Sequence, residues 1–385
     1  MRARRYAFVY GVHASVGGLG VQVENALRAL CLGGDEVHAI GPGPGALREW
    51  TGRITWHVPP RLPPLLGRWS PLRRRAGAVQ ELSDRWIGRF AARRLASIAP
   101  DLCYAFTQVG LETLRWAAAK GIPSVLESPN GHLRDFRQVY VDETRRWCGG
   151  AYHGHPTARM VARVEREYSV AGAIRVSSEW TRRTLAARLP GQTPAVLQQP
   201  IDVDRFQCID RAAPSDGRLQ VCFVGSLDLR KGFVYLLRAA RRAGGTVRLD
   251  LVGGTGDRCC RRLLERERRG VDVRVAPGDP REALARADLF VLPTLEDGSP
   301  FAVAEAMSSG LPVITTTSTG AAEWVRPGET GWVVEPASEA SLSEALIEAL
   351  RRAPDLPGMG RQARLDTERR VRGCDEALSA WVRAQ

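Results

Sequence analysis

Short apolar runs alternate with helical patterns along this chain, and this alternation constrains its fold more than any other feature. In the first half, the runs that we interpret as strands cover residues 6–12, 36–40, 101–106 and 124–126. The helical patterns between them cover residues 21–32 and 111–120, and a glycine-rich loop is expected at 13–20. Strands that alternate with helices indicate a parallel sheet with helices on both faces.

The second half repeats this pattern. Its predicted strands are residues 221–224, 247–252, 271–275, 289–292 and 312–315, and its helices are 233–242, 260–269 and 302–309. A proline-containing segment, 190–206, separates the halves, and 385 residues suit two domains at roughly 100–200 residues each. We predict an α/β protein of two doubly wound Rossmann-like domains, 1–205 and 206–385, that face each other across a cleft. A last helix that crosses back to the first domain is the open alternative.

Charge distinguishes the two halves. The chain has 55 Lys and Arg against 42 Asp and Glu, a net charge of +13. Residues 1–200 hold 28 basic and 15 acidic residues, so the remaining 27 and 27 cancel and the whole excess lies in the first half. Such an excess suits an anionic small molecule, an anionic membrane surface or a nucleic acid. Nucleic acid is disfavoured, because no helix-turn-helix, zinc or RNA-binding motif occurs.

The eight cysteines form no C-x-x-C pair, and the only close pair is the adjacent Cys259 and Cys260. This spacing is neither that of a zinc site nor that of a disulfide framework, so we predict a reduced, cytosolic protein. Arg2, Arg4 and Arg5 precede a short apolar stretch, which we interpret as a first strand and not as a signal peptide. No apolar run approaches the ~18–20 residues needed to cross a bilayer.

A proline- and arginine-rich segment, 61–75, precedes a helical pattern with Val79, Leu82, Trp86 and Phe90 at intervals of three to four residues. This helix is interpreted as packing its apolar stripe on the sheet, with arginines toward solvent. A basic, aromatic element that contacts a membrane surface is the alternative. For the preceding segment both interpretations stay open, because Trp69 lies near three consecutive arginines.

The most informative segment is LFVLPTLEDGSPFAVAEAMSSGLPVI, residues 289–314. A strand ends near Pro293, an acidic loop with Asp297 follows, and Glu305 lies on the next helix. Backbone amides of residues 299–302, except that of Pro300, precede or begin this helix and are free to bind an anion. Carboxylates accept hydrogen bonds from vicinal hydroxyls. The segment therefore predicts a site for a polyhydroxylated, anionic ligand.

This segment resembles the donor-binding signature of glycosyltransferase family 4, the retaining enzymes of the GT-B fold, whose pattern is E-G-F-G-x-x-x-x-E-A-M-A-x-G-x-P-V. Aligned on Glu-Ala-Met, the second acid is Glu305 and the first is Asp297, with Glu296 as the alternative. Pro300 replaces the second glycine and removes one amide donor. The resemblance implies that the donor lies along Gly298, Ser299, Pro300, Phe301 and Ala302.

Two further segments extend the resemblance. FVGSLDLRKGFVYLLRA, residues 223–239, resembles FVGRLxxxKGxxxLLxA, in which an arginine and a lysine neutralise the donor diphosphate. Lys231 is in place, Ser226 stands where the arginine is common, and Arg230 is the candidate to compensate. The family also implies donor contacts at Gly253 and at Thr319 and Gly320.

In the first half, SVGGLG at residues 15–20 resembles the family's GGxG loop, which implies that Gly17, Gly18 and Gly20 contact the donor phosphates and sugar. ESPNGHLRDF, residues 127–136, lies where the family often has a histidine against the transferred sugar, here His132. A tight turn and a turn histidine are the alternatives. The H-x-H of His153 and His155 lacks further ligands, so we predict no metal.

The resemblance implies a metal-independent, hexosyltransferase-like enzyme without a cofactor. It would transfer a sugar from a nucleotide-diphosphate-sugar donor, with retention, to a glycan, a lipid-linked sugar or a small molecule. Asp297 or Glu296 and His132 would be catalytic. The alternatives are a phosphorylase or hydrolase on the same fold and a basic nucleic-acid-binding module. We expect a cytoplasmic protein, with contact between the basic first domain and the inner face of an anionic membrane left open.

Overall fold

The structure is a computed structural model that describes residues 3–12, 17–44, 53–60, 76–150, 156–214 and 216–385. The chain forms two compact units. Unit 1 contains Met1–Gln138, Tyr152–Pro200 and Gly373–Gln385, and unit 2 contains Val139–Ala151 and Ile201–Arg372. The chain thus passes between the units four times. The sequence alone predicts a division near residue 205, with a last helix that crosses back to the first domain as the open alternative. The candidate residues His13, His153, His155 and Trp69 lie outside the described residues.

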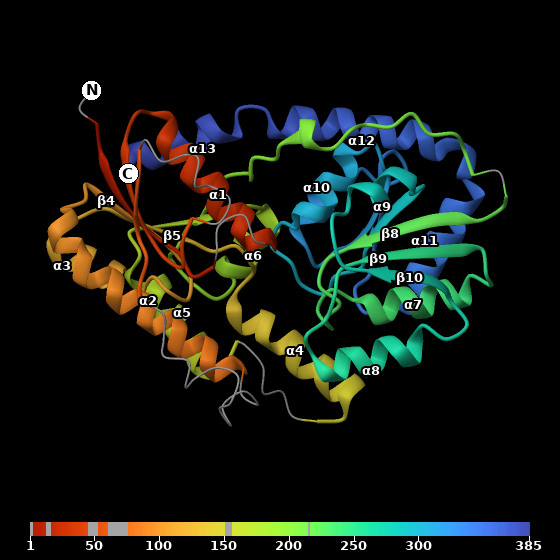
Figure 1. The fold of residues 1–385 in the computed structure, drawn as a ribbon, viewed down its shortest axis with the longest axis horizontal. Helices are drawn as coiled ribbons and strands as arrows, with labels where there is room; N and C mark the ends of the chain where they lie inside the picture. The colour runs from red at the N-terminus through yellow and green to blue at the C-terminus, as the bar shows by residue number, and fades with distance from the viewer. Residues whose placement is uncertain (1–2, 13–16, 45–52, 61–75, 151–155, 215) are drawn as a thin grey trace. The chain divides into compact units, whose positions relative to one another are not determined.

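Within the described residues, seven parallel strands form the sheet of unit 1, in the order β3-β2-β1-β4-β5-β6-β7 (Figure 1). They are β1 (Arg5–Val9), β2 (Glu36–Ile40), β3 (Ile54–His57), β4 (Leu102–Phe106), β5 (Ser124–Glu127), β6 (Ala173–Val176) and β7 (Ala195–Val196). In register, Phe8 of the central strand β1 pairs with Ala39 on one side and Tyr104 on the other. A strand with neighbours on both sides and helices on both faces is expected to be apolar, as the buried Tyr6–Val9 of β1 is; only Arg5, at the start of the strand, is charged and partly exposed.

The helices of unit 1 are α1 (Gly17–Leu32), α2 (Ala76–Ile98), α3 (Leu111–Lys120), α5 (Ala158–Val170), α6 (Glu179–Ala186) and α13 (Cys374–Ala384), with the start of α4 (Leu133–Cys148). α1 packs against α13, whereas α3 packs between α2 and α5. The loop expected at 13–20 ends earlier than predicted, because α1 begins at Gly17. Glycines are poor helix formers, which is why the sequence does not predict this first turn.

The stripe predicted on α2 is wrong in part. Leu82 is 46% exposed, whereas Glu81 and Asp84 are buried beside Ile87. Glu81 accepts a hydrogen bond from the Thr157 hydroxyl at 2.9 Å, which compensates for the burial of its carboxylate. The sequence pattern misses this face because it counts only apolar residues.

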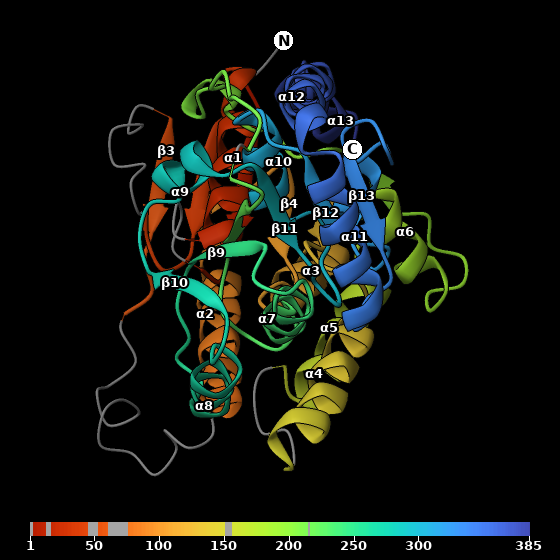
Figure 2. The ribbon, with the colours of Figure 1, turned by 90° about the vertical axis from the view of Figure 1, so that its right-hand side faces the viewer.

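Within the described residues, unit 2 is a six-stranded parallel sheet in the order β10-β9-β8-β11-β12-β13. Its strands are β8 (Leu219–Val224), β9 (Val247–Val252), β10 (Asp272–Ala276), β11 (Leu289–Leu292), β12 (Val313–Thr316) and β13 (Gly331–Val334). Its helices are α7 (Phe233–Arg242), α8 (Arg258–Glu267), α9 (Arg281–Arg286), α10 (Phe301–Ser308), α11 (Glu339–Arg351) and α12 (Leu356–Val371). α7 packs beside both α8 and α11, and α10 packs against α12 (Figures 1 and 2).

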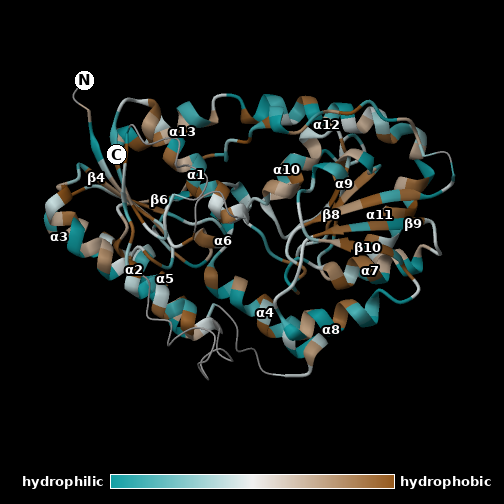
Figure 3. Cartoon of the chain, in the orientation of Figure 1, coloured by the Kyte–Doolittle hydropathy of each residue, from teal (hydrophilic) through white to brown (hydrophobic). Residues whose placement is uncertain are grey.

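Each unit has its own apolar core. The strands are largely hydrophobic, and the helices turn hydrophobic residues toward the core and hydrophilic residues outward (Figure 3). In unit 2 the core gathers around Phe223, Phe233 and Phe290, all of them fully buried. Both units have the strand order of doubly wound folds, in which strands 3-2-1-4-5-6 follow one another. The predicted fold class, two Rossmann-like parallel-sheet domains, is confirmed.

One disulfide corrects the prediction that all cysteines are reduced. Cys148, at the end of α4, is bonded to Cys259 in the first turn of α8, with 6.0 Å between their Cα atoms. The two residues are 111 positions apart in the sequence, so only the packing of α4 in unit 2 brings them together. The spacing of cysteines along the chain can predict local motifs, but it cannot predict a disulfide between residues that are far apart in the sequence.

Candidate active site

Polar side chains gather at the carboxyl ends of three neighbouring strands of unit 2. Arg230 and Lys231 follow β8, Glu296 and Asp297 follow β11, and Thr319 follows β12. Because β8, β11 and β12 are adjacent in the sheet, their carboxyl ends meet at one edge, where ligands of such sheets bind. The structure therefore brings together residues that the sequence predicts from three separate motifs.

The acidic loop after β11 is fixed by backbone hydrogen bonds from both sides. The amide of Leu295 donates to the carbonyl of Arg230 at 2.7 Å. The amide of Asp297 donates to the carbonyl of Ser318 at 3.3 Å, and that of Gly320 donates to the carbonyl of Asp297 at 3.1 Å. The loops that follow β8 and β12 thus hold the acidic loop in place.

Four charged side chains form the centre of the site. Arg230 Nη1 donates to the carbonyl of Glu296 at 2.5 Å and lies 3.4 Å from Oε2 of Glu296 and 3.4 Å from Oδ2 of Asp297. Lys231 Nζ pairs with the same Oδ2 of Asp297. Burial disfavours the charged form of Asp297, but Lys231 and Arg230 outweigh burial and hold the pKa of this carboxyl below its ordinary value.

The two candidates for the first acid differ in their surroundings. Asp297 contacts both cations, whereas the carboxylate of Glu296 is paired with Arg230. Both side chains are at least nine-tenths buried. Asp297 also pairs in a short parallel bridge with Thr319, so its backbone belongs to the edge that β12 extends.

Ser226 occupies the position at which the family pattern has an arginine. Its hydroxyl donates to Asp228 Oδ2 at 2.5 Å, and Asp228 Oδ1 accepts from the amide of Lys231 at 3.0 Å. The serine thus helps to close the turn that presents Lys231. The Arg230 side chain is directed at the acidic loop, where its guanidinium donates to the carbonyl of Glu296.

Gly253 lies after β9, beside the turn that follows β8. Its φ is +153°, and a Cβ there would lie 1.9 Å from the carbonyl oxygen of Gly225. Only glycine permits this close approach of two backbone segments. Gly253, which the sequence predicts as a donor contact, is therefore also required for the packing of these two backbone segments.

α10 begins where the sequence places an anion site. Pro300 is its N-cap, and the amides of Phe301 and Ala302 lie in the first turn, where amides have no partner within the helix. Gly298 is buried, and Ser299 is half-buried beside it. Because Pro300 has no N–H, the donors at this end are the flanking amides.

Glu305 follows one turn later on α10. Burial raises the pKa of its carboxyl to about 7; Arg205 opposes this rise and Asp279 adds to it. At neutral pH the group is therefore close to half-protonated. A carboxyl with such a raised pKa beside an anion site is typical of functional sites.

Thr319 and Gly320 complete the edge of the site. Thr319 is fully buried, and its hydroxyl accepts from the amide of Ala321 at 3.2 Å, which caps a short 3₁₀ helix (Gly320–Trp324). The structure thus assigns the Thr319 side chain a capping role, whereas its backbone borders the acidic loop.

Sequence reasoning missed Tyr140 on α4. Its hydroxyl hydrogen-bonds with the Arg230 guanidinium, and burial raises the pKa of Tyr140. This end of α4 is held on α7, where the Tyr235 hydroxyl donates to Glu143 Oε2 at 2.8 Å. No motif marks Tyr140, because only the placement of α4 in unit 2 brings it to Arg230.

In unit 1, the predicted glycines lie at the start of α1. Gly17 has a φ of +66°, and Gly18 and Gly20 belong to the first turn. Gln22, one turn later, donates to the buried carboxylate of Glu127. This contact fixes the beginning of α1 to the carboxyl end of β5.

His132 is 1% exposed and packs against Tyr168, with 5.6 Å between the ring centroids. The amide of Arg134 donates to its Nδ1 at 3.2 Å, which assigns the ring proton to Nε2. Burial lowers the pKa of His132, with Asp135 and Glu165 opposing it. The ring is therefore neutral at neutral pH.

The polar residues that the sequence groups with His132 do not converge on it. Glu127 is fully buried and pairs with Arg175. Arg134 pairs with Glu165, and Asp135 with Arg188, both near the surface. The segment 127–136 therefore contains one buried network and two surface pairs.

Comparison with known proteins connects this site to sugar transfer. Residues 218–352 match the family described as Glycosyl transferases group 1. This segment is a glycosyl transferases group 1 domain. It contains Ser226, Arg230, Lys231, the acidic loop and Glu305, all of which lie in unit 2.

Curated relatives agree with this match. The chain is 30% identical over 191 residues to the putative colanic acid biosynthesis glycosyltransferase WcaL of Salmonella typhimurium, covering 46% of this chain and 47% of that protein. It is 30% identical over 262 residues to a GDP-mannose-dependent phosphatidylinositol monomannoside mannosyltransferase of Mycolicibacterium smegmatis, covering 57% and 66%. The alignments thus span about half to two thirds of these relatives.

Solved structures share the whole fold. Sucrose-phosphate synthase of Thermosynechococcus elongatus superposes with a TM-score of 0.78 at 17% identity, over 99% of this chain and 98% of that one. HepE of Anabaena, solved in complex with UDP-glucose, superposes with a TM-score of 0.73 at 16% identity, over 99% and 100%. Together with the two parallel sheets, these likenesses identify the GT-B fold.

Two features are absent from the described residues. No helix among them is both long and apolar enough to span a bilayer. Within the same residues, no three His, Cys, Asp or Glu side chains are grouped as metal ligands.

Proposed function

We propose that this protein is a retaining, hexosyltransferase-like glycosyltransferase that moves a sugar from a nucleotide-diphosphate-sugar to a hydroxyl group of an acceptor. The observation that carries the proposal is the cluster of Arg230, Lys231, Glu296 and Asp297, inside the segment that matches glycosyl transferases and that also contains Glu305. The names of the curated relatives and the UDP-glucose complex of HepE support the same reaction class.

Each side chain has a chemical role in this proposal. The Glu305 carboxylate accepts hydrogen bonds from the ribose hydroxyls, and Asp297 or Glu296 faces the sugar. Lys231, Arg230 and the amides at the start of α10 stabilise the charge that grows on the departing diphosphate. His132 and the glycines of α1 are the unit 1 candidates for sugar and phosphate contacts, and the positive charge of Lys231 and Arg230 makes the reaction metal-independent.

The ion pairs of the site shape how a donor binds. Lys231 and Arg230 are already paired with Asp297 and Glu296, so a diphosphate competes with carboxylates for these cations. A bound diphosphate would draw Lys231 from Asp297 and release that carboxylate toward the sugar. Lys231 thus couples donor binding to the release of the Asp297 carboxylate.

The acceptor side is proposed from charge. The excess of +13 in residues 1–200 suits an anionic acceptor, such as a phosphorylated lipid-linked sugar or an acidic glycan. The same charge would suit a cytoplasmic enzyme whose first half contacts an anionic membrane. A neutral small-molecule acceptor gives this charge no role.

A panel of sugar nucleotides, led by UDP-glucose and GDP-mannose, tests the proposal by thermal shift and by release of nucleotide diphosphate. We expect one donor to raise the melting temperature and Glu305→Ala to abolish that rise, whereas Glu344→Ala on the exposed face of α11 leaves it intact. The absence of stabilisation by any donor, or unchanged stabilisation in Glu305→Ala, would refute the assigned site.

Two controls address the finer parts of the proposal. The anomeric configuration of the product, compared with that of the donor by NMR, tests retention. Turnover in excess chelator tests metal independence, and its complete loss would contradict it. Phosphate-dependent cleavage of a glycoside without any nucleotide would indicate a phosphorylase.

A further inference from the structure

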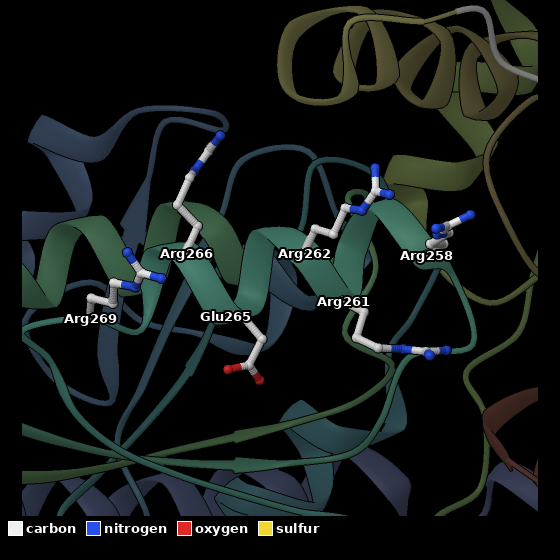
Figure 4. A pocket seen from close by; sticks show the side chains of 6 residues that line it. All are labelled: Arg258, Arg261, Arg262, Glu265, Arg266 and Arg269. Atoms are coloured by element: carbon white, nitrogen blue, oxygen red, sulfur yellow. The ribbon is translucent and has the colours of Figure 1, made fainter.

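The exposed face of α8 carries an unusual concentration of arginine. Between residues 258 and 269 the sequence has six arginines and two glutamates. Cys260, Leu263, Leu264 and Glu267 face inward and are buried. The outward face, which we call the α8 arginine face, consists of Arg258, Arg261, Arg262, Glu265, Arg266 and Arg269, and these residues line a shallow hollow (Figure 4).

Most of these arginines lack an acidic partner. Buried Glu267 pairs with Arg266 at 2.7 Å and also with Arg238 and Arg241 from α7. Glu265 pairs with Arg268 at 3.6 Å. No described residue forms an ion pair with Arg258, Arg261, Arg262 or Arg269, whose charges therefore face solvent. The net charge of zero in the second half conceals this local separation of charge.

The arginines also act against the helix that carries them. The first turn of α8 contains no acid, and Arg258, Arg261 and Arg262 place positive charge at the positive end of the helix dipole. Arg258 and Arg262, like Arg262 and Arg266, are like charges four residues apart, which destabilise a helix. The N-cap Asp257 offsets this only in part, by accepting from the amide of Cys260 at 2.8 Å. A face that lowers the stability of its own helix requires a reason outside the helix.

The side chains diverge. Figure 4 shows Arg262 and Arg266 directed to one side of α8, Arg261 and Glu265 to the opposite side, and Arg258 and Arg269 toward the two ends. Guanidinium groups that spread apart cannot converge on one phosphate. From Arg258 to Arg266 the helix rises about 12 Å, so the face suits several separate anions spread over a surface.

We propose that the α8 arginine face is a docking surface for an anionic lipid bilayer, with guanidinium groups bound to headgroup phosphates. Guanidinium groups bind phosphate with paired hydrogen bonds, and each basic residue near such a surface adds to its attraction. A flat bilayer matches divergent side chains on a helix whose apolar side is packed inward, whereas a duplex nucleic acid is held by side chains that converge around it. The exposed positions carry no apolar residue, so α8 adsorbs to the headgroups and does not insert. The proposal goes beyond the proposed sugar transfer and does not depend on it.

Vesicle flotation of the full chain tests this proposal. We expect the protein to float with phosphatidylcholine vesicles that contain phosphatidylglycerol and not with phosphatidylcholine alone. Binding should be present at about 0.1 M salt and lost at about 1 M, where the Debye length falls from about 10 Å to about 3 Å. The variant R258Q/R261Q/R262Q should have a partition constant lower by about tenfold or more.

The matched control, R351Q/R361Q/R369Q, removes the same charge from exposed positions of α11 and α12 and should float like the unaltered protein. The α8 variant should melt at the same temperature as the unaltered protein or higher, because it removes charges that oppose the helix dipole. Equal loss of flotation in both variants, unchanged flotation of the α8 variant, or no flotation of the unaltered protein would overturn the proposal. Displacement of the protein from vesicles by duplex DNA at equal phosphate, with an α8-dependent DNA affinity, would assign the face to nucleic acid instead.

Discussion

Asp297 and Glu305 belong to one loop and helix, yet their surroundings hold them in different protonation states. Two cations beside Asp297 keep its pKa low, so it is ionised throughout the neutral range. Burial, which Arg205 opposes only in part, raises the pKa of Glu305 to about 7. The same kind of side chain therefore responds to pH at one position and not at the other.

This difference predicts how donor affinity depends on pH. The ionised form of Glu305 accepts hydrogen bonds from ribose, and this form is lost as pH falls through about 7. We expect the dissociation constant for the donor that the panel identifies to rise below pH 7, approaching about tenfold per pH unit. Titration calorimetry between pH 6 and pH 8 measures it. Glu305→Gln should bind weakly at every pH, and a variant profile as steep as the native one would contradict this role.

At the residue scale, the sequence predicts which charged side chains follow the carboxyl ends of the strands. Lys231, Asp297 and Glu305 are recognisable because motif and strand end coincide. Tyr140 is not, because its contact with Arg230 depends on where α4 packs. Protonation states are likewise invisible in the sequence, since burial decides them.

At the scale of elements, α4 and α8 are joined by the bond between Cys148 and Cys259. A disulfide stabilises chiefly by constraining the unfolded chain, typically by about 2–4 kcal/mol. We therefore expect Cys148→Ser to lower the free energy of unfolding of unit 2 by about this amount under oxidising conditions. Urea unfolding with and without reductant measures the effect. Reductant should remove the difference between the two proteins, and a difference that persists would mean that the serine acts through packing.

α2 yields a prediction because it buries acids. Burial raises the pKa of Asp84 to about 7, with Gln80 and Arg163 opposing the rise. Its pKa in the unfolded chain is about 3.9. Between these two pKa values the folded state binds more protons than the unfolded chain. The free energy of unfolding therefore falls by up to about 4 kcal/mol as pH rises from about 4 to 7, and it levels off above pH 7. Urea unfolding across this range should give a flatter profile for Asp84→Asn, whereas Asp142→Asn on the exposed part of α4 should leave the native slope.

Most of the elements that the sequence predicts lie within two residues of their predicted bounds, because in them a strong apolar periodicity ends at a glycine or another helix-breaking residue. α3, α7, β9 and β11 begin and end where predicted. The prediction fails where burial does not follow hydrophobicity. α2 turns acids inward, and α1 starts on glycines. In both cases tertiary packing overrides the local pattern.

At the scale of the whole molecule, unit 1 is completed by residues from the end of the chain. Leu378 and Val382 of α13 are fully buried in its core, and Arg383 pairs with Asp35 at 2.8 Å. Leu378→Ala should lower the free energy of unfolding of unit 1 by about 2–5 kcal/mol, while Glu376→Ala on the exposed side of α13 changes it little. Hydrogen exchange of β1 and β4 amides measures unit 1 separately. Equal protection in both variants would mean that α13 contributes nothing to this core.

The placement of Val139–Ala151 in unit 2 has a consequence for recombination between relatives. A chimera made by exchanging the chain at a single point near residue 200 would pair the Tyr140 of one parent with the Arg230 of the other. It would likewise place the Cys148 of one parent opposite whatever residue the other parent has at position 259. An exchange that keeps every contact intact needs four junctions, at 138, 151, 200 and 372. Each unit is built from segments that are not contiguous in the sequence, so a single crossover in the gene cannot exchange one whole unit for that of a relative.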